Sequence, residues 1–576
     1  MSESQSPTVA RYLIDRLAEI GIRHLFGVPG DFNLVFLDAV VAHPEVNWVG
    51  NANELNAAYA ADGYARCRGA AALLTTFGVG ELSAINGLAG SYAEYVPVLQ
   101  IVGAPSLHAK HEHAVLHHTL GDGDFEHFSR MHSEVTVSQA YLTPENAADE
   151  IDRVISEMLV ERRPGYIVLP TDVVHAPART LNPLRVPEAP FDPGQLAAFS
   201  AHARQLLAGT DRPAVLADFL VDRFGAREAL QELLSRSGFP YATMLLGKGL
   251  LDESSENFVG TYVGAASEAG VREVIEGADA LIVAGVLLTD VLTAGFTHKL
   301  HAERLIELQP FHARVSGREY QNVPLRCALR ELTKIAGVTA RRGSRVEELA
   351  PTIRTSETAR LTQALFWDRM QEFLRPGDVV VAEQGTSFFG IGPKRCPANI
   401  KFLGQPLWGS IGYALPAAFG AGTALPDRRL IVFVGDGSAL LTAQEIGTML
   451  RDGLKPIILL LNNEGYTVER AIHGPEQPYN DIPRWDWIML PRALGPDRRS
   501  TTVRAQTHGE LRRALALAEN SDTLVLLEIV LPRQDVPELL AKITRGVAQL
   551  NGSAGKDAQP RHLGERHRQM PCRSRT

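Results

Sequence analysis

Short runs of apolar residues alternate with longer amphipathic stretches along most of the chain. Residues 9–21 carry apolar side chains at helical spacing and end at Gly21, whereas the runs AALLTTFG and VPVLQIVG are largely apolar and end in glycine. Apolar runs of this length are typical of strands buried on both faces of a parallel sheet, with crossover helices between them. The pattern therefore predicts an α/β protein built on doubly wound parallel sheets.

The same pattern occurs in three consecutive blocks, which we interpret as three doubly wound domains over residues 1–185, 195–345 and 358–548. Stretches rich in proline and arginine separate the blocks and are typical of linkers. Residues 551–576 are basic and contain few large apolar side chains. They predict a disordered tail, with a peripheral arm for an acidic partner as the alternative.

Composition narrows the class of protein. The chain has 576 residues, of which 45% are hydrophobic, and a formal net charge of −9 without a long basic stripe, so nucleic acid is not an expected partner. Four cysteines without CxxC spacing argue against a zinc finger or a disulfide scaffold. No apolar run suggests a signal peptide or a membrane span, so we expect a cytoplasmic protein that does not enter membranes.

A Gly-Asp-Gly sequence follows the apolar run 430–434 in the third block. Asp436 lies where this strand must end, and ligands of open α/β sheets bind outside the carboxyl ends of strands. The glycines at 435 and 437 let the backbone approach a ligand closely, and the next segment is helical. A carboxylate here would repel a phosphate unless a divalent cation such as Mg²⁺ lay between them.

A second loop, Asn462-Asn463-Glu464-Gly465, follows one crossover later and is expected beside the first loop in a parallel sheet. Asn463 offers an amide oxygen and Gly465 a backbone carbonyl to the same cation. The alternative is a polar turn at a strand end with an unrelated asparagine pair. The earlier sequence around Asp122 also has glycine on both sides, but it follows no buried strand and no second loop accompanies it, so we do not expect a metal there.

Several other titratable side chains have both a structural and a catalytic interpretation. Glu54 begins an alanine-rich helix, where the helix dipole alone favours a glutamate. Asp31 lies in a Gly-Pro loop and is a candidate turn or N-cap residue. His117 and His118 end a histidine-rich segment that could form a zinc site, a polar surface loop or a proton-transferring pair. Glu469 could pair with a neighbouring arginine on a helix face.

Taken together, these motifs resemble those of the thiamine-diphosphate enzymes. The pair GDG and NN resembles their diphosphate and Mg²⁺ motif, and VNWVGNANELNAAYAADGYAR resembles the segment that activates the pyrimidine. The adjacent histidines resemble the 2-oxo acid (pyruvate) decarboxylase branch. QPLWGSIGYALPAAFGA and NNEGYTVERAIHGPEQPYND are most similar to the indolepyruvate, phenylpyruvate and branched-chain decarboxylases. The resemblance extends from about residue 8 to residue 550.

This resemblance implies thiamine diphosphate and Mg²⁺ as cofactors, and pyrimidine-binding, central and diphosphate-binding roles for the three domains, the central one without flavin. The implied catalytic residues are Glu54, Asp31, His117, His118 and Glu469. The implied metal ligands are Asp436, Asn463 and Gly465. The implied cofactor contacts are Glu54, Gln384, Gly409, Ile411, Gly435, Asp436, Gly437, Ser438, Asn463, Gly465 and Tyr466.

The implied substrate pocket contains Val291, Phe388 and Ile472. Val291 and Phe388 align with a larger Tyr and Trp of pyruvate-specific relatives, which favours an aromatic or long aliphatic 2-oxo acid. We therefore expect non-oxidative decarboxylation of indole-3-pyruvate or phenylpyruvate to the aldehyde and CO₂. The family implies a homodimer with shared active sites at minimum and a homotetramer as the usual assembly. The alternatives are a pyruvate or branched-chain decarboxylase, a thiamine-dependent carboligase, a zinc hydrolase and a non-catalytic homologue.

Overall fold

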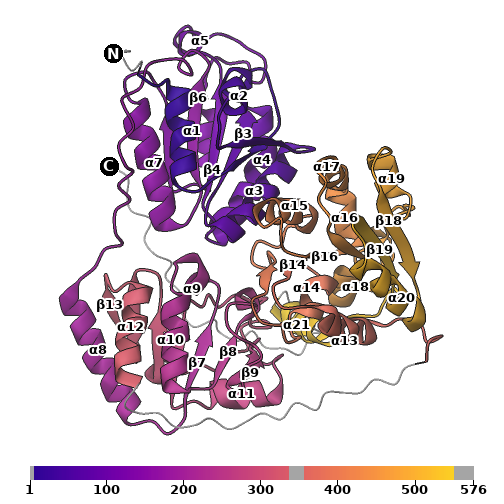
Figure 1. The fold of residues 1–576 in the computed structure, drawn as a ribbon. Helices are drawn as coiled ribbons and strands as arrows, with labels where there is room; N and C mark the ends of the chain where they lie inside the picture. The colour runs from indigo at the N-terminus through magenta and orange to yellow at the C-terminus, as the bar shows by residue number, and fades with distance from the viewer. Residues whose placement is uncertain (1–5, 337–355, 551–576) are drawn as a thin grey trace.

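The computed structural model describes residues 6–336 and 356–550 and contains three α/β domains (Figure 1). The predicted tail at 551–576 and the end of the predicted central block after residue 336 lie outside the described residues. None of the helices in the two described ranges has the length and apolar content that a bilayer crossing needs.

The first domain contains a six-stranded, entirely parallel sheet in the order β2-β1-β3-β4-β6-β5. Its strands are β1 (His24–Gly27), β2 (Asn47–Gly50), β3 (Ala71–Thr76), β4 (Val98–Ala104), β5 (Ser138–Tyr141) and β6 (Gly165–Pro170). Its helices are α1 (Val9–Glu19), α2 (Leu34–Val41), α3 (Glu54–Arg68), α4 (Val79–Ala93), α5 (Leu107–His111), α6 (His127–His132) and α7 (Ala147–Glu161).

The third domain repeats this topology. Its parallel sheet has the order β15-β14-β16-β17-β19-β18, which matches the first sheet strand for strand. The strands are β14 (Val379–Ala382), β15 (Lys401–Leu403), β16 (Leu430–Gly435), β17 (Ile457–Asn462), β18 (Ser500–Ala505) and β19 (Leu524–Val530). The helices are α13 (Gln363–Phe373), α14 (Thr386–Ile391), α15 (Ala414–Ala424), α16 (Asp436–Thr442), α17 (Glu445–Arg451), α18 (Thr467–Ile472), α19 (Leu490–Leu494), α20 (His508–Glu519) and α21 (Glu538–Leu550).

The central domain departs from an all-parallel sheet, because β12 and β13 run antiparallel at one edge of the order β13-β12-β11-β10-β7-β8-β9. Ser316 and Gly317 join them with φ values of 49° and 80°, the positive angles that a two-residue hairpin loop requires. The strands are β7 (Pro213–Ala217), β8 (Tyr241–Thr243), β9 (Phe258–Thr261), β10 (Ala280–Ala284), β11 (Leu305–Leu308), β12 (His312–Val315) and β13 (Arg318–Gln321). The helices are α8 (Pro193–Ala208), α9 (Leu220–Arg223), α10 (Arg227–Ser237), α11 (Ala269–Glu276) and α12 (Leu325–Ala336).

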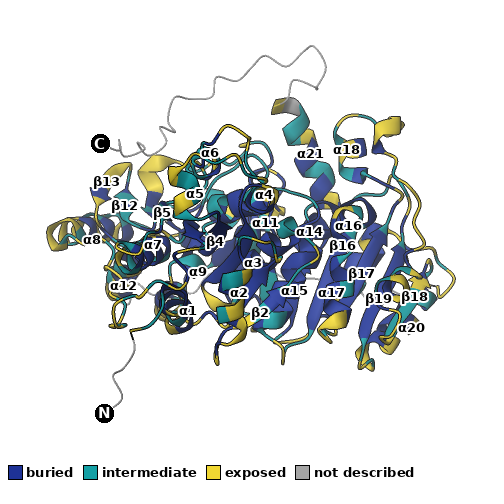
Figure 2. Ribbon diagram, turned by 90° about the horizontal axis from the view of Figure 1, so that it is seen from above, coloured by how far each residue is buried: buried dark blue, intermediate teal, exposed yellow. Residues whose placement is uncertain are grey.

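The central strands of the first and third sheets are buried almost throughout. Every residue of β3 and β4 is buried, and so is every residue of β17 except the last. Figure 2 shows these strands in dark blue between helices whose outer faces are teal or yellow. Burial on both faces explains why the sequence of these strands is apolar at successive positions.

The first and third domains pack through α3 and α15, which lie side by side (Figure 1). A Cβ atom at Gly63 would lie 2.1 Å from the Ala417 carbonyl oxygen, and one at Gly420 would lie 1.8 Å from the Ala60 carbonyl oxygen. The two backbones are therefore close enough that only glycine fits at either position. Alanine-rich segments of both helices contribute to one hydrophobic core that the two domains share.

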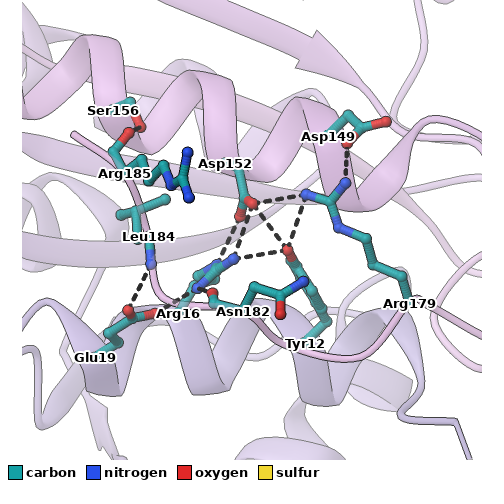
Figure 3. A network of polar contacts seen from close by, with 10 residues as sticks. All are labelled: Tyr12, Arg16, Glu19, Asp149, Asp152, Ser156, Arg179, Asn182, Leu184 and Arg185. Carbon is teal, nitrogen blue, oxygen red and sulfur yellow. Dashed lines mark hydrogen bonds and ion pairs between the residues drawn. The ribbon is translucent and has the colours of Figure 1, made fainter. Parts of the chain in front are cut away.

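A polar network attaches residues 179–185, at the end of the first domain, to helices α1 and α7 (Figure 3). The buried Arg16 of α1 bonds to Asp152 of α7 at 2.6 Å and to the Asn182 carbonyl oxygen at 2.5 Å. Arg179 also bonds to Asp152, at 2.8 Å, and Glu19 accepts from the Leu184 amide at 2.7 Å. The start of the predicted linker is thus attached to α1 and α7, away from the loops at the carboxyl ends of the strands.

Candidate active site

Titratable side chains gather at the carboxyl edge of the first sheet. Asp31 follows β1, and His117 and His118 follow β4. Asp31 Oδ2 lies 2.6 Å from His117 Nε2, and Asp31 Oδ1 lies 3.8 Å from His118 Nδ1. We call these three residues the Asp31 cluster. Both imidazoles face one carboxylate because the segment is irregular, with a φ of 62° at His118.

The Asp31 cluster is open to solvent. The exposed fractions of its side chains are 61% for His117, 46% for Asp31 and 30% for His118. The ring of Phe32 stacks on His117 with 5.0 Å between ring centroids. An accessible imidazole paired with a carboxylate is a candidate general acid or base.

The buried Glu81 fixes the loop against which the histidine segment packs. Glu81 accepts from the Gly78 amide at 2.8 Å and from the Tyr166 hydroxyl at 2.6 Å. A Cβ at Gly78 would lie 2.0 Å from the His118 carbonyl oxygen, so this loop packs directly against the histidines. Burial raises the pKa of Glu81 to about 7, although both hydrogen bonds lower it. The sequence analysis missed this residue.

Glu54 begins α3, directly after the edge strand β2, and is half-buried. Burial raises the pKa of its carboxyl group, and a hydrogen bond from its own backbone amide partly opposes the shift. A Cβ built at Gly80 would lie 3.3 Å from Glu54 Oε1, so the carboxyl group faces the loop after β3. A raised pKa favours sharing of a proton between a carboxyl group and a basic ring nitrogen.

The Gly-Asp-Gly loop of the third domain has a different character. Asp436 is buried at the carboxyl end of β16 and accepts from the Gly437 amide at 2.8 Å and from the Gly465 amide at 3.1 Å. Burial raises the pKa of Asp436 to about 6, and the two amides oppose that shift. The loops after β16 and β17 therefore meet, as the crossover spacing predicts.

The carboxamide of Asn463 completes this arrangement. One end of it lies 3.1 Å from Asp436 Oδ1 and 3.0 Å from the Gly465 carbonyl oxygen, and its other end lies 3.1 Å from Thr467 Oγ1. With its nitrogen toward the two oxygens, the amide donates to both. With its oxygen toward them, three oxygen atoms meet at spacings of about 3 Å, which suit neighbouring ligands of an octahedral Mg²⁺ ion. The donor set of Asp436, Asn463 and Gly465, the Asp436 cluster, therefore fits Mg²⁺.

Arg470 of α18 fixes the backbone of the Asp436 cluster. Its buried guanidinium donates to the carbonyl oxygens of Asn463 at 3.2 Å, Glu464 at 2.6 Å and Asn480 at 3.2 Å. The sequence suggested Arg470 only as a possible ion-pair partner of Glu469. In the structure its guanidinium bonds to these carbonyl oxygens instead. The side chain of Glu469 is exposed on the same helix.

The segment that carries Gly409 and Ile411 is held from several sides. Glu94 of the first domain accepts from the Leu407 amide at 3.0 Å, and the Tyr59 hydroxyl donates to Ser410 Oγ at 2.7 Å. The buried Glu383, after β14, accepts from the amides of Gly412 at 3.2 Å and Ala414 at 2.9 Å. Burial raises the pKa of Glu383 to about 7. Helices α3 and α4 of the first domain thus help to shape a loop of the third.

The remaining predicted site residues lie around these loops. The Tyr466 ring packs against Gly437, where a Cβ would lie 2.7 Å from it. Ser438 is buried in α16, and Gly435 caps that helix. Phe388 is fully buried and packs against Phe402 and Gly404. Gln384, Val291 and Ile472 are each partly buried.

Except for Val291, which follows β10 of the central domain, the predicted residues form two groups, at the carboxyl edges of the first and third sheets. Among the described residues, no hydrogen bond or ion pair joins the Asp31 cluster to the Asp436 cluster within one chain.

Comparison with known proteins identifies the chemistry that these edges serve. The family model described as the N-terminal TPP binding domain of thiamine pyrophosphate enzymes matches residues 7–127, the central-domain model matches residues 200–334, and the C-terminal TPP binding domain model matches residues 394–529.

The chain is similar along almost its whole length to curated relatives called alpha-keto-acid decarboxylase. The protein of Mycobacterium leprae (strain TN) is 50% identical over 94% of this chain and 96% of the relative. The protein of Mycolicibacterium paratuberculosis (strain ATCC BAA-968 / K-10) is 50% identical over 93% and 96%, and that of Mycobacterium tuberculosis (strain ATCC 25618 / H37Rv) is 49% identical over 94% and 97%.

The chain belongs to the thiamine pyrophosphate enzyme family. Its cofactor is accordingly thiamine diphosphate, and the two TPP binding domains of the family are the two domains whose sheets share one strand order. The expected fold, three α/β domains of the thiamine pyrophosphate enzymes, is confirmed.

Proposed function

We propose that the chain converts an aromatic or otherwise bulky 2-oxo acid, with indole-3-pyruvate and phenylpyruvate favoured, to the aldehyde and CO₂. That it is a thiamine-diphosphate-dependent 2-oxo acid decarboxylase follows from its family and from relatives of 50% identity. The observation that carries the proposal is the Asp31 cluster, because aldehyde release requires a proton donor beside the carbon that loses CO₂.

The Asp436 cluster would hold Mg²⁺, and Gly435, Gly437 and Ser438 would lie along the diphosphate. The fit rests on the three converging oxygens and on the close approach that a glycine at 437 allows. Residues that would bind the cofactor rings are Glu54, Gln384, Gly409, Ile411 and Tyr466. When bound, thiamine diphosphate supplies an electron sink for the carbon that loses CO₂.

The protein's own part is proton transfer and orientation. The half-buried Glu54 would share a proton with the aminopyrimidine, an exchange favoured by its raised pKa. His117, paired with Asp31 at 2.6 Å, would deliver a proton to the carbon from which CO₂ has departed. His118 of the first domain and Glu469 of the third domain would assist. Exclusion of water would favour loss of the charged carboxylate.

We also propose that the active site is shared between two chains, with a homodimer at minimum and a homotetramer as the usual assembly. The absence of contact between the Asp31 and Asp436 clusters among the described residues supports this, because both groups are needed at one cofactor. The exposure of the Asp31 cluster supports it further, since proton transfer to a carbon proceeds best away from bulk water.

Substrate size is the finer part of the proposal. Val291 and Ile472 are partly buried side chains without the bulk of tyrosine or tryptophan. By the family resemblance, Phe388 stands where pyruvate-specific relatives carry the larger ring of tryptophan. Steady-state aldehyde release with indole-3-pyruvate, phenylpyruvate, 2-oxoisovalerate and pyruvate tests it. The expected result is a higher kcat/KM for the aromatic acids, and a V291Y variant should lose about 10-fold or more on them while keeping pyruvate.

Other outcomes would change the assignment in defined ways. A preference for pyruvate in the unmodified protein would overturn the substrate size and keep the reaction. A product that forms only when a second oxo acid is present would indicate a carboligase. Activity that chelators abolish and that zinc restores without thiamine diphosphate would indicate a hydrolase that uses the histidines.

A further inference from the structure

A buried carboxylate of the third domain grips the segment that carries Glu54. Glu445 of α17 has no solvent exposure. Its Oε1 accepts from Asn51 Nδ2 at 2.8 Å, and its Oε2 accepts from Asn56 Nδ2 at 2.7 Å. We call these three residues the Glu445 clamp.

The two asparagines of the clamp lie on either side of Glu54 in the chain, so the clamp holds the segment both before and after that residue. A second contact from the same helix reinforces it, since Arg451 donates to the Gly50 carbonyl oxygen at 2.7 Å. Helix α17 therefore holds the segment at its start, at Asn51 and again within the first turn of α3.

Before α3 begins, the segment has a neighbouring strand on one side only in the sheet of its own domain. Strand β2 is the edge strand of its sheet and pairs only with β1. Beyond the strand, the Asn51 amide still bonds to the Gly27 carbonyl oxygen at 2.9 Å, which fixes one side only. The other side is covered by α17, which belongs to a different domain.

A carboxylate is well suited to this task. Both amide groups point their N–H donors at it, and an ionised carboxylate accepts at both oxygens in any rotamer that reaches them. Burial of the charge is costly, and the two amides offset part of that cost. An apolar side chain would fill the space but would leave two buried amide groups without acceptors.

We propose that Glu445 is a positioning residue for Glu54: it fixes the start of α3 so that the Glu54 carboxyl group meets the cofactor in one orientation. The proposal rests on the proposed role of Glu54 at the aminopyrimidine. Helix α17 directly follows α16, which begins at Asp436. With active sites shared between two chains, one helical unit thus carries a ligand of one diphosphate site and holds the segment whose carboxyl group serves the other site.

The first test needs neither cofactor nor substrate. Amide hydrogen exchange of the folded, cofactor-free protein, read by mass spectrometry, should become faster over residues 50–57 in E445A and should change little elsewhere. The matched control is E528A. Glu528 is also a buried carboxylate of the third domain and accepts from Asn462 at 2.7 Å and from Arg504 at 2.7 Å, and among the described residues neither hydrogen bond leads to the segment around Glu54. Unchanged exchange over 50–57 in E445A would overturn the proposal.

The second test separates positioning from general stability. In E445A we expect kcat to fall about 10- to 100-fold with KM within about twofold, because a displaced reactive group slows the chemical step more than substrate binding. E445Q should recover most of the loss, since one asparagine amide can turn to accept from the glutamine. Equal losses in E445A and E445Q, or a change in KM alone, would contradict the positioning role.

The clamp can also be opened from its other side, which covers the case in which E445A does not fold. N51A removes one donor at the domain surface and should reproduce part of the kcat loss. Where E445A does fold, the effect of N51A should largely vanish in an E445A background, because residues that act through one contact are not additive. Additive effects would show that the two residues act separately. If the unmodified protein failed to decarboxylate 2-oxo acids, the proposed function would be wrong. The hydrogen-exchange experiment would still test whether Glu445 holds the segment around Glu54.

Discussion

The first and third domains share one strand order and place their candidate residues at the same edge of the sheet, but they treat charge in opposite ways. In the first domain, Asp31 and His117 are exposed and paired with each other. In the third, Asp436 is buried and surrounded by backbone amides and carbonyls. Identical topology thus supplies a place for a ligand, while burial decides what chemistry that place supports.

This difference matches the two tasks of the cofactor site. The groups proposed to move protons must be reached by the substrate, and within a single chain they are exposed. A group that holds a cation must keep its charge and its geometry, which rigid buried loops favour. Substitutions at either edge test this comparison. We expect those at the buried edge to weaken cofactor binding and those at the exposed edge to lower kcat, by different amounts.

The largest effect is expected at the buried edge. D436N should weaken the binding of thiamine diphosphate in the presence of Mg²⁺ by at least about 100-fold, because it removes the only charged ligand of the cluster. Calorimetric titration measures this directly. D122N is the matched control, since Asp122 also lies between two glycines but is exposed and bonds to His127. Equal affinity of D436N and D122N for thiamine diphosphate would show that the metal does not bind at this site.

At the exposed edge we expect slower chemistry with intact binding. H117A should lower kcat by about 10²- to 10⁴-fold, the usual contribution of a positioned proton donor, while the affinity for thiamine diphosphate stays unchanged. Steady-state kinetics and the same titration separate the two quantities. H111A, which removes an exposed histidine of the same segment, should retain kcat. A comparable loss in H111A would mean that the segment acts only through its fold.

The smallest effect concerns stability and sharpens the contrast between exposed and buried groups. Glu81 has a folded-state pKa of about 7 against an ordinary value of 4.5, so the folded protein keeps a proton that the unfolded chain releases. Its contribution to stability is complete below pH 4.5 and is lost as the pH rises to about 7. Relative to the unmodified protein, E81Q should therefore gain a few degrees in Tm between pH 5 and pH 8.

Thermal unfolding at both pH values checks this prediction. The control is E126Q, a change in a partly exposed carboxylate nearby. If the melting temperatures of E81Q and the unmodified protein kept a constant difference, Glu81 would be ionised in the folded state and its hydrogen bonds would need another explanation.

The parts of this molecule that local sequence determines were predictable from the residues alone. The apolar runs of β3, β4 and β17 indicated buried parallel strands, and the fold of three α/β domains is confirmed. The crossover spacing brought the Asp436 and Asn463 loops together, because neighbouring parallel strands must end at one edge. The antiparallel β12 and β13 were not expected, although Ser316-Gly317 carried a turn signal.

The supporting residues could not be predicted in this way. Glu81, Arg470 and Glu445 are separated in sequence from what they hold, or they contact backbone atoms, and neither relation leaves a periodic pattern. Their signal was an acidic or basic side chain in an otherwise apolar helix, which is equally typical of a solvated face. Only the folded arrangement distinguishes the two cases.

The two glycines at the seam between α3 and α15 set a tolerance for the whole catalytic unit. Since backbone meets backbone at Gly63 and Gly420, a single methyl group there would act as a wedge that no side-chain rearrangement could absorb. A substitution at either position would therefore push α3 and α15 apart and disturb the packing of the first domain against the third. Two hydrogen atoms in place of methyl groups are what allow the two domains to share one core.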